Sequence, residues 1–104
     1  MAMEYAVSVV FTKSGEMKYI SHLDLLRLWG RAMRRAGIPF ALSQGFSKHP
    51  RISIKRALKL GVESENEEAE FILREEIPAD VFRERLRGAL PDGIRIKDAA
   101  IRRK

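Results

Sequence analysis

Residues 21–37 read SHLDLLRLWGRAMRRAG, and this stretch decides the fold because it predicts the longest helix of the chain. Ser21 is a typical N-cap residue, and Asp24 lies where a carboxylate suits the positive end of the helix dipole. Gly37, which an Ile-Pro pair follows, is a typical stop signal. The sequence therefore predicts a helix from about His22 to Ala36.

This helix should separate an apolar face from a basic face when its residues are placed about 100° apart around the axis. The apolar face gathers His22, Leu25, Leu26, Trp29, Ala32, Met33 and Ala36. The opposite face carries Asp24, Arg27, Arg31, Arg34 and Arg35. Like charges at this spacing destabilise a helix unless a negative partner meets them, and each guanidinium group can grip a phosphate through two hydrogen bonds. That partner could be the acidic segment 63–70, or RNA or DNA, although the face could also be merely solvated.

Outside this helix, short apolar runs alternate with turn residues and predict a second helix and a sheet. Strands are expected at residues 5–12, 38–42, 51–60, 69–74 and 94–101, an extended path at 17–20, an acidic turn at 64–68 and a helix at 78–90. This order predicts an α+β fold, a ferredoxin-like βαββαβ sandwich with two helices on one face of an antiparallel sheet. Residues 51–60 could form one strand or a hairpin that adds an extra strand.

The composition fits a single α+β domain over residues 1–104. Hydrophobic residues make up 45% of the chain and charged residues 33%, which is typical of globular domains. The absence of cysteine excludes disulfides, thiolate nucleophiles and Cys-containing zinc sites within this chain. Because no apolar run could span a bilayer and the N-terminal residues lack the features of a signal peptide, we expect a cytoplasmic protein without membrane contact.

The net charge of +6 is unevenly distributed along the chain. Residues 63–76 hold seven of the fourteen acidic residues and one basic residue, so the other ninety residues carry nineteen Lys and Arg against seven Asp and Glu, a balance of +12. Clustered positive charge is the usual electrostatic footprint of proteins that bind phosphate polyanions. A soluble or very stable protein can also carry many basic residues without such a partner.

A loop at residues 43–51, SQGFSKHPR, combines aromatic, basic and hydrogen-bonding side chains around Gly45. Phe46 could stack on a base while basic neighbours hold phosphates, or it could simply plug the core while Gly45 turns the chain. Lys55, Arg56 and Lys59 extend the basic track. The candidate nucleic-acid-binding residues are therefore Arg27, Arg31, Arg34, Gln44, Phe46, Lys48, Arg51, Lys55 and Arg56.

His22 and His49 are the two histidines of the chain. His22 falls on the apolar side of the predicted helix, where a buried structural role is the commoner explanation. If the two rings converged, one as base and the other as acid could cleave RNA through its own 2′-hydroxyl without a metal. Asp24 lies about 160° from His22 around the helix, which disfavours a shared metal site. With no P-loop, dinucleotide fingerprint or nucleophile elbow, no metal or cofactor is expected and a non-catalytic role is favoured.

Four segments carry a resemblance to a known family. They are YISHLDLLR at 19–27, RRAGIP at 34–39, SQGF at 43–46 and HPRIS at 49–53. In order and spacing they resemble the radical SAM-linked family, also called the DUF2344 domain. The resemblance implies a bacterial accessory domain that works with a radical SAM partner, and it supplies no reaction. The family domain is generally longer, so the resemblance leaves open that the chain is its N-terminal half.

The chain departs from the family pattern in two places. Ser47-Lys48 stands where relatives often have Asn-Pro, and Lys55, Arg56 and Lys59 occupy a stretch that is more apolar and proline-containing in many relatives. Both departures make this chain more basic. They also weaken the case for a small-molecule pocket formed by the usual loop.

Three hypotheses follow from the sequence. The preferred one is a non-catalytic module that binds RNA or a ribonucleoprotein through the basic helix and the Gln-Gly-Phe loop. The second is a protein-interaction domain whose basic face docks on a radical SAM enzyme, and the third is a metal-independent ribonuclease that uses His22 and His49. A homodimer is also conceivable, because the closing strand could pair within the chain or with a second copy.

Overall fold

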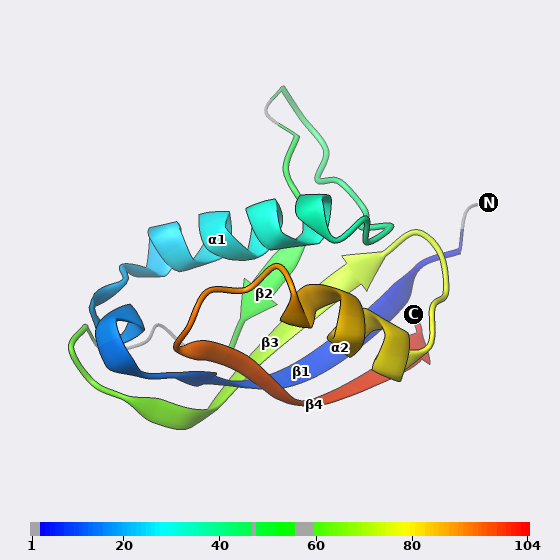
Figure 1. The fold of residues 1–104 in the computed structure, drawn as a ribbon. Helices are drawn as coiled ribbons and strands as arrows, with labels where there is room; N and C mark the ends of the chain where they lie inside the picture. The colour runs from blue at the N-terminus through cyan, green and yellow to red at the C-terminus, as the bar shows by residue number, and fades with distance from the viewer. Residues whose placement is uncertain (1–2, 47, 56–59) are drawn as a thin grey trace.

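A computed structural model describes residues 3–46, 48–55 and 60–104, which form one sheet and two helices (Figure 1). The elements are β1 (Tyr5–Lys13), the 3-10 helix η1 (Gly15–Tyr19), α1 (His22–Arg35), β2 (Ile52–Ile54), β3 (Ser64–Leu73), α2 (Ala79–Arg87) and β4 (Ile94–Arg103). The strands pair antiparallel in the order β2-β3-β1-β4, and both helices cover the same face of the sheet (Figure 1). The predicted ferredoxin-like βαββαβ sandwich is confirmed.

The first helix, α1, begins and ends within one residue of its predicted limits. The Ser21 hydroxyl accepts a hydrogen bond from the backbone N–H of Asp24 at 3.1 Å, as expected of an N-cap. Gly37 has a φ of +68° just after the helix, a conformation that glycine adopts without the steric cost of a side chain. No helix in the described part of the chain is long and apolar enough to cross a membrane.

The prediction that His22 lies on the core side of α1 is wrong, because His22 is exposed. Residues 21–24 are all exposed, and Leu25 is the first buried residue of the helix. The first turn therefore projects beyond the core, so the periodicity that holds for Leu25, Trp29 and Met33 does not bury a side chain there.

An aromatic chain joins the helices to the two central strands. The Trp29 ring of α1 makes edge contacts with Phe11 of β1 and Phe71 of β3, with ring centroids 5.2 and 5.0 Å apart. Phe71 lies 5.7 Å from Phe82 of α2. All four rings are completely buried, so they fix both helices against one face of the sheet.

Two predicted segments adopt a different structure. Residues 64–68, expected as an acidic turn, form the first half of β3, because pairing with β1 extends along them. The paired strand therefore overrides the low strand propensity of glutamate. Residues 17–20, expected to be extended, lie largely within η1, where the Met17 N–H donates to Ser14 O and the Ile20 N–H donates to Met17 O.

The closing strand β4 pairs with β1 of the same chain from Ile94 to Arg103. On the other side of the sheet, residues 39–41 and 51–54 both bond to β3: the Ala41 N–H donates to Ile72 O, and the Ile72 N–H donates to Arg51 O. The predicted strand 38–42 is thus reduced to isolated bridges. Of the predicted strand 51–60, β2 covers three residues, and residues 56–59 lie outside the described part of the chain.

The described residues between these two segments, 42–46 and 48–50, leave the sheet and rise beside α1 (Figure 1). We call them the 42–50 loop. Its stem is closed by the bridge between Leu42 and Pro50 and by two hydrogen bonds, from the Ser43 N–H to His49 O at 2.8 Å and from the His49 N–H to the Ser43 hydroxyl at 3.2 Å. These bonds hold the tip of the loop clear of the sheet.

We predict that Gly93→Ala destabilises the fold by about 3 kcal/mol. Gly93 has a φ of +95°, and a Cβ on this residue would clash with the Ser14 carbonyl oxygen. Ser14 is held in this place because its N–H donates to Gly93 O at 2.9 Å. Gly88→Ala is the matched control, because Gly88 has a φ of −76° and open space around its Cα. It should change the unfolding free energy by less than about 1 kcal/mol. Urea unfolding of both variants tests this, and equal stabilities would contradict it.

Candidate nucleic-acid interface

A groove of about 460 Å³ lies between α1 and the segment formed by the loop stem and β2. It is lined by Leu23, Leu26, Arg27, Gly30, Arg31, Arg34, His49, Pro50 and Ile52. Gly30 is buried and faces the loop stem, where a Cβ on Gly30 would be 3.7 Å from Pro50 Cγ, an ordinary van der Waals distance. The groove therefore combines apolar lining residues with three arginines from the helix.

These arginines are exposed along one side of the groove. Arg27 pairs with Asp24 at 3.3 Å, but both side chains are about 60% exposed, and such surface pairs contribute little stability. Arg31 and Arg34 have no carboxylate within 4.0 Å among the residues described. Arg34 instead lies over the Phe40 ring, 5.6 Å from its centroid. Two of the three guanidinium groups thus remain free to meet an anion.

The acidic segment 63–70, which was one candidate partner for the arginines of α1, forms its contacts elsewhere. Glu68 pairs with Lys55 at 3.7 Å, and Glu70 pairs with Arg102 at 3.1 Å. Glu63 accepts a hydrogen bond from the Gly15 N–H at 2.8 Å. In the described structure, these three carboxylates therefore bind other groups, and none of them pairs with an arginine of α1.

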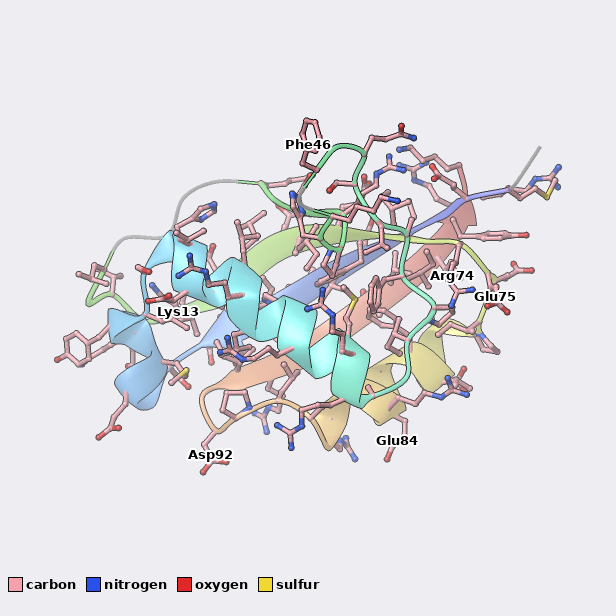
Figure 2. All side chains as sticks on the ribbon, turned by 90° about the horizontal axis from the view of Figure 1, so that it is seen from above. Lys13, Phe46, Arg74, Glu75, Glu84 and Asp92 are labelled. Carbon is pink, nitrogen blue, oxygen red and sulfur yellow. The ribbon has the colours of Figure 1, made fainter. Side chains whose placement is uncertain are left out.

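The tip of the 42–50 loop carries an aromatic ring with no burial at all. Phe46 is 110% exposed relative to its reference state, and its side chain points away from α1 and the body of the molecule (Figure 2). The alternative that Phe46 plugs the core is therefore wrong. Gln44 and Lys48 are also exposed beside it, and Gly45 has a φ of +113°, which disfavours any other residue. The side chains of Gln44, Phe46 and Lys48 therefore all face solvent.

Two of the predicted binding residues lie away from the groove. Ile52 and Ile54 pack against the core, so the alternating Arg51 and Lys55 side chains belong to the face of the sheet that the helices leave open. Arg51 donates to the Glu4 carboxylate at 2.7 Å, and Lys55 pairs with Glu68. Arg56 lies outside the described residues.

The structure describes eight of the nine predicted residues and divides them into separate groups. Arg27, Arg31 and Arg34 line the groove, Gln44, Phe46 and Lys48 belong to the loop, and Arg51 and Lys55 form ion pairs elsewhere. The sequence did not identify Gly30 and Pro50, which line the groove, as residues of the site. A glycine inside a strong helix pattern often has a packing reason, and this signal could have pointed to Gly30.

The two histidines have different surroundings. His49 lines the groove, and its Nδ1 is 3.2 Å from Pro50 O. His22 is not among the groove-lining residues. His22 lies eight residues before Gly30, the helix residue that faces Pro50. This separation is about 12 Å along the helix axis. This arrangement gives no support to an acid–base pair of histidines.

A larger hollow of about 670 Å³ lies where α2 ends and β4 begins. Arg83, Arg87, Arg95 and Lys97 line it, but Glu65 and Asp92 lie among them. Lys97 also donates to the Asn66 side chain at 3.3 Å. Because carboxylates share this hollow, we regard the groove beside α1 as the better candidate for a phosphate polyanion.

Fold and surface together define a small ferredoxin-like α+β protein with a basic groove and a projecting aromatic loop. Residues 7–104 match a family described as "Uncharacterized protein conserved in bacteria (DUF2344)". Because the match spans nearly the whole sequence, the chain belongs to this family, as the resemblance implied. Neither a curated protein nor a solved structure matches the chain.

We predict that Gly30→Ala is tolerated and raises the unfolding free energy by about 0.5–1 kcal/mol, because alanine is a better helix former than glycine. The added methyl group would meet Pro50 Cγ at 3.7 Å and Arg34 Nη1 at 3.8 Å, which are ordinary van der Waals distances. Chemical denaturation measures the change. A clear loss of stability would show that the loop stem cannot accept a methyl group in the groove.

Proposed function

We propose that the chain is a non-catalytic module that binds RNA or a ribonucleoprotein and presents it to a radical SAM partner. One observation carries the proposal: the exposed guanidinium groups of Arg31 and Arg34, with no carboxylate within 4.0 Å in the described structure, lie in a groove beside the projecting loop of Phe46. The radical SAM partner is proposed from the family resemblance alone.

The charge arrangement suits a phosphate backbone. Arg31 follows Arg27 by four residues and Arg34 follows Arg31 by three, so the three groups lie on successive turns of one helix face. Binding of a phosphate to Arg31 or Arg34 would break no ion pair within the described residues. One guanidinium group can bind two oxygens of the same phosphate. Such two-point contacts would also orient the RNA backbone along the helix.

RNA binding should weaken as salt increases. Three phosphate contacts on a single strand predict that log K falls with log salt concentration with a slope of about −2. Fluorescence anisotropy with a labelled RNA of mixed sequence at several salt concentrations measures this slope. Undetectable binding at low salt, or binding that is independent of salt, would contradict the proposal.

A charge reversal tests whether the groove is the site. Arg31→Glu should weaken RNA binding at least tenfold, because it removes one phosphate contact and adds a repulsive charge. Arg83→Glu is the matched control, since Arg83 is an exposed arginine of α2 and the change in net charge is the same. If both variants lose affinity equally, net charge rather than the groove determines binding.

A second candidate function is docking on a protein, and an exposed apolar cluster favours it. Tyr19, Leu60 and Val62 are 62%, 64% and 50% exposed. Gly61, which stands between Leu60 and Val62 in the chain, is held beside Tyr19, because the Gly61 N–H donates to Lys18 O at 2.6 Å and Gly61 lies against the Tyr19 ring. Apolar side chains gathered on a surface often mark a protein contact.

If this cluster binds the radical SAM protein, Tyr19→Ser should abolish co-purification of the two proteins, and nuclease treatment should leave the wild-type complex intact. Arg31→Glu is the comparison variant and should have no effect on this complex. Loss of the complex in Arg31→Glu but not in Tyr19→Ser would move the contact to the basic helix face instead.

A further inference from the structure

The groove and the loop tip also indicate which form of RNA the protein would take. We infer that its ligand is single-stranded RNA, with one unpaired base stacked on the Phe46 ring and a neighbouring base covering the apolar part of the groove. This inference rests on the proposed function, because it specifies the substrate class of the same site.

The Phe46 ring provides the first argument. Its side chain is 110% exposed, so it contributes no packing to the fold, and the Gly45 backbone and closed stem present it at the tip of the loop. A planar ring in this position offers a stacking surface to another planar group. In a duplex, the faces of each internal base are already stacked on its neighbours. An unpaired base is therefore the matching partner for Phe46.

The groove provides the second argument. Leu26, Pro50 and Ile52 contribute apolar surface, while Arg27, Arg31 and Arg34 lie on the helix side. A duplex presents its charged sugar–phosphate edge outward and would leave this apolar surface uncovered. A single strand can turn a base inward and leave its phosphates beside the arginines. The apolar lining residues therefore match the base of an unpaired nucleotide, and the arginines match its phosphate.

The two sites are close enough for one short strand. Phe46 is three residues from His49, which lines the groove, so the Cα atoms of these two residues are at most about 11 Å apart. Recognition of double-stranded RNA instead relies on a surface that spans two successive minor grooves, roughly 16 base pairs. The ring and groove form a more local site. Charge complementarity also favours RNA over an uncharged peptide as the occupant of this groove.

The test compares two RNAs of equal total phosphate number, an unstructured single strand and a blunt duplex, in direct titrations at one low salt concentration. We expect the wild-type protein to bind the single strand more tightly. Phe46→Ala should weaken single-strand binding about tenfold and leave duplex binding unchanged. Phe46→Trp should retain single-strand binding, because it keeps an aromatic surface. Met3→Ala is the control for loss of an exposed apolar side chain, since Met3 is 48% exposed and lies outside the groove and the loop, and should change neither affinity.

The outcomes separate the inference from the proposed function. Equal wild-type affinities for the two RNAs, or a Phe46→Ala variant that loses affinity for both or for neither, would overturn the single-strand inference while RNA binding itself stands. Absence of binding to either RNA would overturn both proposals. Circular dichroism of each variant should match the wild type, because neither Phe46 nor Met3 is buried.

Discussion

The contacts of Trp29 with Phe11 and Phe71 determine the arrangement of the whole helix layer. They place α1 over the two central strands and fix its rotation about its own axis. Once Trp29 faces the sheet, the helical repeat turns Arg27, Arg31 and Arg34 outward. The same rotation directs Gly30, the next residue, toward Pro50. The position of the candidate interface is thus a consequence of core packing, although none of these three arginines takes part in the core.

The sequence predicts best those features that are decided locally. The limits of α1 follow from Ser21 and Gly37, which act on the backbone within a few residues of themselves. The first half of β3, by contrast, is not decided locally. Its glutamates have low strand propensity, and it forms a strand because it pairs with β1. Phe11 opposite Glu67 is such a pair, and the two residues are more than fifty positions apart in the sequence. Strand limits therefore depend on partners that local patterns do not reveal.

The same distinction explains the candidate site. The helix arginines could be assigned to one face because α1 is long and regular, whereas Arg51 and Lys55 could not be placed before the limits of the three-residue strand β2 were known. The alternation of β2 sends both side chains to the open face, where Glu4 and Glu68 meet them. The groove itself was beyond prediction, because it depends on Pro50 lying against Gly30, twenty residues earlier in the chain.

The distribution of charge between the two faces matters more for function than the total of +6. On the open face of the sheet, Arg51, Lys55 and Arg102 each meet a carboxylate, so the positive and negative groups there largely cancel. On the outer side of α1, Arg31 and Arg34 meet no carboxylate within 4.0 Å in the described structure, and the exposed pair of Arg27 and Asp24 is weak. Arginines retained only for solubility have no reason to gather on one face, because dispersed charge serves solubility equally well. Their concentration beside an apolar groove supports our proposal of an anionic ligand that also carries an apolar surface, and an unpaired nucleotide has both properties.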